Sequence, residues 1–292
     1  MNILTFDIEE WAVAKANGYG SVEKYAEYDG CLGKILDVMD ARNFKGTFFC
    51  TGMMATDFPQ VVKLIRSRGH EIGCHSFKHV WLNTMSKEEL KEDTHKSVVA
   101  LEQCIGQKIK SYRAPAFSIG KENRWAFEIL AQQGITRDAS VYPAERDLGG
   151  FAQFGEKTPT MVYCNNAMFK EFPVSTTRLL GHELAYTGGG YFRFFPLSYV
   201  KKEMAKADYV MTYFHIGDLI PESSGMMSRK DFENYYKIKG TLKNRLLRHV
   251  KTNIGRKSAF VKLIKLMETE DFVNLEQADK IIDWEQAPSV II

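Results

Sequence analysis

Two histidines with the spacing of metal ligands, His75 and His79, lie four residues apart. On one face of a helical turn, such a pair can place both ring nitrogens about 2.0–2.1 Å from a single ion. The pair follows a short run with glycine at both ends, Gly69–Gly73, which indicates a helix end, a strand and a turn. In α/β proteins, sites are built at the carboxyl ends of strands. The alternative is two solvated or core histidines, because such a pair arises by chance among seven histidines.

Carboxylates gather where the first apolar run of the sequence, residues 3–7, comes to an end. In an extended chain alternate side chains share a face, so we expect Asp7 and Glu9 to project together and Glu10 to oppose them. Two carboxylates at a strand end suit one metal ligand and one general base. The alternative is the acidic start of a loop.

Three further polar residues follow segments with strand character. Arg113 comes after residues 109–112, Asp138 follows a predicted helix and a short apolar stretch, and His215 ends residues 209–215. An isolated arginine is more often a solvated surface charge, but this one shares its strand edge with the carboxylates and the histidines. The sequence therefore predicts that these side chains converge at one edge of a sheet.

A glycine-rich turn, Gly188–Gly190, leads into an aromatic segment, Tyr191–Phe194. We predict that this segment is a strand that passes close to a ligand, which makes Tyr191 and Arg193 candidate substrate-binding residues. The alternative is a tight bend that packs on the apolar residues after it. Both interpretations stay open.

Strands and helices alternate along the chain in the way that positions these residues. The apolar spacing, a capping box at residues 86–89 and the glycines at 69, 106 and 134 predict an α/β protein. Residues 145–172 break this pattern with glycine, threonine, asparagine and short β-prone pieces, which indicates a loop and hairpin excursion over one face. Helices are expected near residues 32–39, 57–69, 86–106 and 123–133, and strands near residues 3–7, 45–52, 69–74, 109–112, 135–140 and 209–215.

The composition, 45% hydrophobic and 26% charged residues in 292, allows one large domain with a full core. The sequence has no run of about 18 apolar residues, and its beginning lacks the pattern of a secretory signal, so we expect a cytoplasmic protein unless a leader was removed. Five widely spaced cysteines agree with a reducing compartment.

Five short motifs resemble those of the polysaccharide deacetylases, carbohydrate esterase family 4 with its NodB homology domain. The motifs are Thr5-Phe6-Asp7, His75-Ser76-x-x-His79, Arg113-x-Pro115, Asp138 in Asp-Ala-Ser-Val-Tyr-Pro, and His215. The resemblance covers residues 1 to about 220, and the Gly-Gly-Gly-Tyr-Phe-Arg stretch is similar to a subgroup with a C-terminal extension. It implies a distorted (β/α) barrel of about seven parallel strands over residues 1–220. Residues 221–292 would form a basic helical extension packed on the barrel.

The first motif departs from the common family pattern. Family members usually carry two adjacent aspartates, a base followed by a metal ligand, whereas Ile8 follows Asp7 here. Some relatives use Asp-x-Asp or Asp-x-Glu, and strand alternation then makes Glu9 the substitute ligand. Glu10 is the reserve candidate.

The resemblance implies a divalent metal ion, zinc being the first choice, held by Glu9, His75 and His79. Asp7 would be the general base, kept ionised and oriented by Arg113. His215 would protonate the leaving amine with Asp138 as its orienting partner, and the backbone N–H of Ala116 would bind the oxyanion.

The function implied is the removal of N-acetyl groups from an amino-sugar glycan or glycan precursor in polysaccharide biosynthesis. Two alternatives remain: a hydrolase of another non-peptide C–N bond such as a ring amide, and a catalytically silent sugar-binding relative. Acetate release from N-acetylated glycans separates the three.

The segment Arg229–Lys265 is a separate electrostatic region with 12 basic and two acidic residues, within a chain of net charge +3. Its apolar residues recur at roughly helical spacing, which predicts amphipathic helices. A solvated basic face is the plain explanation. The sharper one is contact with an anionic membrane surface or a lipid-linked precursor. Nucleic acid is not expected, because no recognisable binding module accompanies the charge.

Overall fold

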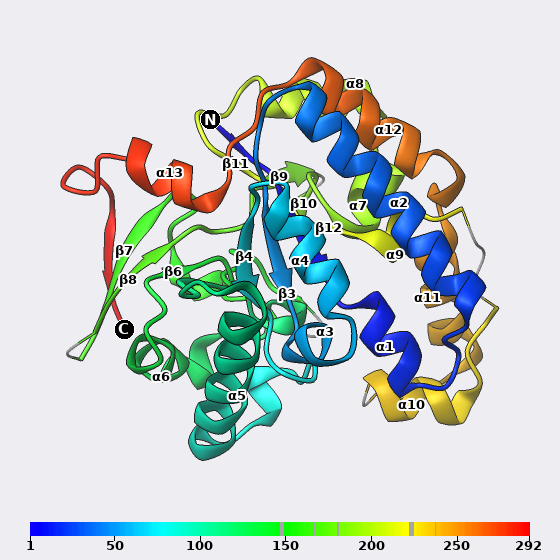
Figure 1. The fold of residues 1–292 in the computed structure, drawn as a ribbon, viewed down its shortest axis with the longest axis horizontal. Coiled ribbons are helices and arrows are strands. Elements are labelled where there is room, and N and C mark those ends of the chain that lie inside the picture. Colours follow the sequence, from blue (N-terminus) through cyan, green and yellow to red (C-terminus); the bar gives the residue numbers. More distant parts are fainter. Residues whose placement is uncertain (147–148, 166, 180, 222–224, 237) are drawn as a thin grey trace.

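A sheet of mostly parallel strands forms the centre of the protein in the computed structural model (Figure 1). The structure describes residues 1–292 except 147–148, 166, 180, 222–224 and 237. In the described part of the chain, the sheet order is β12 (Phe214–His215), β2 (Thr5–Ile8), β3 (Thr47–Cys50), β4 (Glu71–Cys74), β5 (Ser111–Tyr112), β6 (Arg137–Asp138), β8 (Ala167–Glu171), β7 (Thr160–Cys164) and β13 (Ser289–Ile291). The first seven of these strands run parallel to one another. The prediction of a distorted (β/α) barrel with about seven parallel strands is confirmed.

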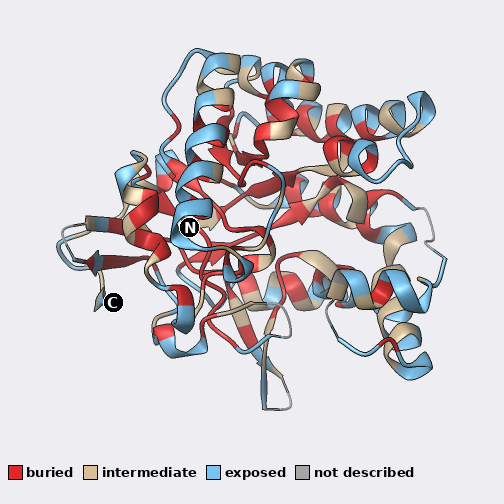
Figure 2. Ribbon diagram, turned by 90° about the horizontal axis from the view of Figure 1, so that it is seen from below, coloured by how far each residue is buried: buried red, intermediate tan, exposed pale blue. Residues whose placement is uncertain are grey.

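Helices cover the outer face of these strands, so β2, β3 and β4 are buried along their whole length. Figure 2 shows the strands in red at the centre, with exposed residues on the outward faces of the helices. The first half of the chain supplies α1 (Glu10–Ala16), α2 (Val22–Ala41), α3 (Gly52–Asp57), α4 (Pro59–Ser67), α5 (Lys87–Ile105) and α6 (Ala126–Gln132). Short 3₁₀ turns are η1 (Leu82–Thr84), η2 (Pro115–Phe117), η3 (Lys121–Asn123) and η4 (Ala152–Phe154).

Local sequence sets where α5 begins and ends. The Ser86 side chain accepts a hydrogen bond from the Glu89 N–H, and the Glu89 carboxylate accepts one from the Ser86 N–H, so the predicted capping box is present. The helix ends at Gly106, whose φ of 70° is left-handed and suits glycine.

Two β-hairpins lie in the second half of the chain. The predicted excursion over residues 145–172 contains the antiparallel pair of β7 and β8. It differs from the prediction because β8 also pairs with β6 and so extends the central sheet. The second hairpin joins β9 (Thr176–Leu179) and β10 (His182–Ala185).

The predicted strand over residues 209–215 is divided into two. β11 (Val210–Met211) pairs with β1 (Asn2–Ile3), whereas β12 pairs with β2. Thr212 separates the two strands, and its side chain hydroxyl accepts a hydrogen bond from the Thr5 N–H. The chain therefore changes sheets before it reaches His215.

The prediction that Tyr191–Phe194 is a strand is wrong, because α7 (Gly189–Phe194) is helical. Gly188 approaches Tyr213 so closely that a Cβ atom would lie 2.1 Å from the Tyr213 carbonyl oxygen. The helical turn buries Phe192, whose ring lies 4.9 Å from that of Phe214, and leaves Tyr191 partly exposed. The helical period of 3.6 residues, and not strand alternation, therefore decides which of these aromatic residues are buried.

The last part of the chain packs back onto the strands and the first helices. It contains α8 (Leu197–Met204), α9 (Ile216–Leu219), α10 (Arg229–Tyr236), α11 (Leu242–Asn253), α12 (Arg256–Thr269) and α13 (Leu275–Ile281). α12 contacts α2, α7, α8 and α9 (Figure 1), and its Leu263 and Leu266 are fully buried. The C-terminal strand β13 pairs with β7.

The domain boundary at residue 220 stays a prediction. None of the helices in the described ranges is both long and apolar enough to cross a membrane.

Candidate active site

Polar side chains from several strands meet at the carboxyl edge of the parallel sheet. Asp7 lies near the end of β2, and Glu9 follows that strand directly. His75 follows β4, and Arg113 follows β5. His215 ends β12, where it stands opposite Asp7 in the strand register. The predicted convergence of these residues is therefore present in the structure.

Glu9, His75 and His79 form a cluster whose ligand atoms all lie within 4.8 Å of one another. The Glu9 Oε2 atom is 2.6 Å from the His79 Nε2 atom and 3.4 Å from the His75 Nε2 atom. The His75 Nδ1 atom is 2.7 Å from the Arg113 carbonyl oxygen. Because a carbonyl oxygen accepts, Nδ1 donates in this contact, and Nε2 is the nitrogen left to face Glu9 and a metal ion. Two imidazoles and one carboxylate are a donor set that suits a divalent metal ion.

The histidine pair does not lie on a helical turn, contrary to the prediction. Residues 75–79 are irregular, and both Ser76 and His79 have a left-handed φ of 59°. The loop is held from outside: the Ser76 carbonyl accepts from the Gly52 N–H, and the Phe77 N–H donates to Asp93. Tertiary hydrogen bonds, which sequence spacing does not reveal, thus bring the two rings to a centroid distance of 5.1 Å.

The electrostatics of the cluster favour a charged Glu9. Burial raises the pKa of Glu9, but the adjacent His79 and His75 outweigh burial and hold that pKa well below its usual range. Burial lowers the pKa of His79, and the Glu9 carboxylate more than reverses this effect. In the absence of a metal ion these side chains form an ion pair, so protons and a metal ion compete for the same atoms.

Asp7 is buried and paired with Arg113. The Arg113 Nη1 atom donates to the Asp7 Oδ1 atom at 2.9 Å and to the Thr5 hydroxyl at 2.7 Å. Burial raises the pKa of Asp7, but the charges of Arg113, His75 and His215 together outweigh it, so the pKa lies below its usual range. Asp7 is therefore ionised at neutral pH.

His215 lies between two carboxylates. Its Nε2 atom is 3.6 Å from the Asp7 Oδ2 atom, and its Nδ1 atom is 3.5 Å from the Asp218 Oδ2 atom. Burial lowers the pKa of His215, but Asp218 above all, then Asp7 and Glu9, raise it to about 10. The edge thus presents an anionic base candidate and a cationic acid candidate side by side.

Residues 4–137 match the family model described as polysaccharide deacetylase. Residues 4–137 are therefore a polysaccharide deacetylase domain. Residues 139–279 match a second model, described as a domain of unknown function (DUF3473). The resemblance stated from the five motifs is confirmed.

Several curated proteins are similar to part of the chain. A peptidoglycan-N-acetylglucosamine deacetylase of Bacillus cereus is 32% identical over 127 residues, which cover 41% of this chain and 46% of that protein. A peptidoglycan-N-acetylmuramic acid deacetylase of Bacillus subtilis is 31% identical over 94 residues, or 32% of this chain and 36% of that protein. The chain thus spans less than half the length of these relatives.

A crystal structure from Mycobacterium smegmatis, provisionally assigned as a polysaccharide deacetylase, has a similar fold. Its TM-score is 0.64 at 17% sequence identity, and the alignment covers 99% of this chain and 92% of that one. The likeness therefore includes the C-terminal half as well as the deacetylase domain.

The departure of this polysaccharide deacetylase domain from the common first motif has a structural counterpart. Ile8 is fully buried, and Glu9 is the residue that faces the histidines. Glu10, the reserve candidate, turns the other way and accepts a hydrogen bond from the Gly217 N–H at 2.7 Å. Burial, followed by the charge of Glu9, raises the pKa of Glu10 to about 7.

The prediction that Asp138 orients His215 is wrong. The two ring nitrogens of His215 face Asp7 and Asp218, so Asp138 does not take the position predicted for the orienting partner. Its Oδ1 atom accepts from the Ser140 hydroxyl at 2.7 Å. Burial, and then the charge of Asp138, raise the pKa of the Glu171 carboxyl group well above its usual range. The partner of His215 is Asp218, which sequence reasoning missed although it lies three residues further along the chain.

The three predicted substrate-binding residues differ in their surroundings. Ala116 lies in η2 with a left-handed φ of 54°, and its carbonyl accepts from Arg146. Tyr191 is 37% exposed and stacks on Phe195. Arg193 is only 7% exposed, and its guanidinium donates to backbone carbonyls of the C-terminal extension. Arg193 is therefore not placed to bind substrate directly.

Proposed function

We propose that the protein hydrolyses the N-acetyl amide of an amino sugar in a glycan or glycan precursor. The observation that carries this proposal is the grouping at one edge of the sheet of a metal-binding donor set, the ionised Asp7 and the protonated His215. The names of the similar Bacillus proteins, which are peptidoglycan deacetylases, support the same reaction type.

Glu9, His75 and His79 would hold a divalent ion, with zinc as the first choice. The donor set fits, because the His75 Nε2 atom faces the cluster and the Glu9 Oε2 atom makes no well-directed hydrogen bond. When bound, such an ion polarises the amide carbonyl and lowers the pKa of the attacking water.

Proton transfer would be carried out by this chain's own side chains. Asp7 accepts the proton of the attacking water, while Arg113 keeps it ionised and fixes its orientation. The Ala116 N–H, by family resemblance, stabilises the oxyanion. His215 gives its proton to the nitrogen of the breaking C–N bond. The products are acetate and a free amine.

Two other functions are distinguished by substrate. A hydrolase of a ring amide could use the same groups, and a silent sugar-binding relative would bind glycan without turnover. The opposite charges of Asp7 and His215, held by separate partners, favour catalysis over silence.

The test is acetate release by the zinc-loaded full chain from N-acetylated chitooligosaccharides and peptidoglycan fragments, with a cyclic amide as a parallel substrate. We expect release from a glycan and none from the Asp7→Asn variant. Turnover of the cyclic amide alone would overturn the glycan assignment. Glycan binding with no hydrolysis, equal in both proteins, would establish the silent alternative.

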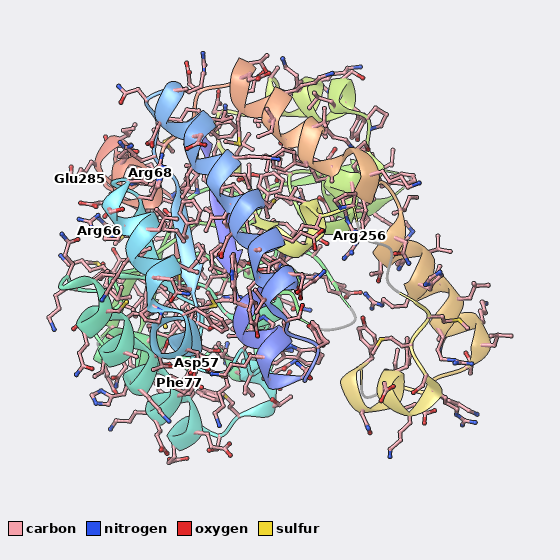
Figure 3. All side chains as sticks on the ribbon, turned by 45° about the vertical axis from the view of Figure 1, so that its right-hand side comes forward. Asp57, Arg66, Arg68, Phe77, Arg256 and Glu285 are labelled. Atoms are coloured by element: carbon pink, nitrogen blue, oxygen red, sulfur yellow. The ribbon has the colours of Figure 1, made fainter. Side chains whose placement is uncertain are left out.

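We also propose that α11 rests on an anionic lipid surface. No residue of this helix is buried, although its side chains are amphipathic. Its exposed apolar residues are Leu242, Leu246, Leu247 and Val250, and its basic residues are Lys243, Arg245, Arg248 and Lys251. Figure 3 shows α10 and α11, in yellow and pale orange, at the lower right-hand edge of the molecule. Lys237, another basic residue of this region, lies outside the described residues.

Co-sedimentation with liposomes of neutral or anionic lipid tests whether α11 binds an anionic lipid surface. We expect recovery only with anionic lipid, falling as salt rises, and reduced by Leu246→Ser with Leu247→Ser. Val99→Ser, a partly exposed valine on the distant α5, is the matched control. Equal recovery with both lipids would contradict the proposal.

A further inference from the structure

We propose that the C-terminal extension completes the active site by positioning His215 through Asp218 and Arg193. The inference rests on the proposed function, in which His215 is the proton donor. Backbone carbonyls at the end of α11 hold Arg193, Arg193 lies beside Asp218, and Asp218 lies beside the Nδ1 side of His215. Asp218 and Arg193 are positioning residues, since neither would touch the substrate.

The contacts are continuous from the extension to the imidazole. The Arg193 Nη2 atom donates to the Lys251 carbonyl at 3.2 Å, and Nη1 donates to the Thr252 carbonyl. The same Nη2 atom is 3.5 Å from the Asp218 Oδ1 atom. The other carboxylate oxygen, Oδ2, is 3.5 Å from the His215 Nδ1 atom. Each link is polar, and Arg193 is almost fully buried.

A second set of contacts fixes α7, the helix that carries Arg193. The Lys262 ammonium donates to the carbonyls of Phe192 at 2.7 Å, Arg193 at 3.0 Å and Phe195 at 2.7 Å. A cation on the last carbonyls of a helix satisfies groups that have no partner within it. Gly255 has a φ of 71°, and a Cβ atom there would lie 2.2 Å from the Arg193 carbonyl oxygen. Arg256, labelled in Figure 3, follows at the start of α12.

This arrangement decides which nitrogen of His215 faces the substrate. A carboxylate beside Nδ1 holds a proton there and directs Nε2 toward Asp7 and the cleavage site. The charged groups around the imidazole are the acidic Asp218, Asp7, Glu9 and Glu10 and the basic His79, while Arg193 and Arg256 act on Asp218. Loss of Arg193 would remove the buried cation that lies beside the Asp218 carboxylate, and loss of Asp218 would free the ring to turn.

The experiment compares Asp218→Asn and Arg193→Met with wild type in three measurements. We expect kcat to fall roughly 10–100-fold with KM and zinc content unchanged, as is typical when the partner of a functional histidine is removed. In Asp218→Asn the alkaline limb of the pH–rate profile should move to lower pH, because His215 loses its proton more easily without Asp218. A merely structural role would change stability without moving this limb.

The link to the extension is tested with Lys262→Met against Lys265→Met, an exposed lysine of the same helix. We expect the first variant to lower kcat and the second to match wild type. Equal activity of the two would refute the role of the extension.

An independent measurement separates this inference from the proposed function. NMR titration of the His215 imidazole in the metal-free protein requires no turnover. We expect its pKa, about 10 in wild type, to fall in Asp218→Asn. An inactive wild type would overturn the proposed function, whereas an unchanged His215 titration would overturn the positioning.

Discussion

Replacing Arg113 with methionine would remove the buried cation that pairs with Asp7 at the carboxyl edge of the sheet. Arg113 is 0% exposed, and its guanidinium donates to Asp7, to the Thr5 hydroxyl and to the Ala139 carbonyl. Methionine fills much of the same volume but donates nothing. Removing one partner of a buried ion pair typically costs about 3–5 kcal/mol, so we expect the free energy of unfolding to fall by that amount at pH 7.

The assay is urea unfolding of four proteins: wild type, Arg113→Met, Asp7→Asn and the double variant. If the cost comes from an unpaired, buried Asp7 carboxylate, Arg113→Met should cost less in the Asp7→Asn background. The remaining loss should be about 1.5–3 kcal/mol, which is the usual value of a hydrogen bond to a charged group. A loss below about 1 kcal/mol in the single variant, or a loss that is the same in both backgrounds, would refute the reasoning.

The pH dependence of this loss has a definite sign. In wild type the lowered pKa of Asp7 stabilises the fold above the unfolded value of about 3.9, and this contribution disappears as the pH falls through the folded pKa. In Arg113→Met only His75 and His215 still oppose burial, so the stabilisation that ionised Asp7 contributes above about pH 4 should shrink. The difference between the two proteins should therefore widen from pH 4 to pH 7.

Three other predictions concern the metal, the chemistry and the fold. Glu9→Ala should lose bound zinc by mass spectrometry while Glu10→Ala retains it, and the opposite result would mean that the chain is bulged after Asp7. Asp7→Asn should keep zinc but lose turnover by about 10² or more, and His215→Ala should lose least with good leaving groups; wild-type rates would remove either residue from the mechanism. Ser86→Ala should lower the free energy of unfolding by about 1 kcal/mol, and an unchanged urea midpoint would show that the α5 cap contributes nothing.

The sequence was sufficient to predict where the site lies, because the carboxyl ends of parallel strands meet at one edge. Asp7, Arg113 and His215 each end or follow a short apolar run, and that local pattern was enough to bring them together. The side of the chain on which Glu9 lies could also be predicted, because the alternation of side chains continues one residue beyond β2.

Features that depend on distant contacts could not be predicted. The loop at residues 75–79 takes its shape from α3 and α5, and α7 is helical where its aromatic residues suggested a strand. The partner of His215 was misassigned because Asp218, in the short helix directly after β12, takes the place at Nδ1 that was predicted for Asp138. Asp218 could have been predicted from the sequence, because a residue three positions further along a helical turn lies on the same side as His215.

The position of β2 has a consequence for how the chain assembles. This strand lies between β3, which follows it within fifty residues, and β12, which ends at His215. Until the chain has been synthesised that far, Thr5–Ile8 is an open, apolar sheet edge of the kind that invites pairing with other chains. The proposed base and acid thus come together only after residue 215 has been synthesised. Truncation before β12 should therefore yield aggregates more readily than a smaller working enzyme.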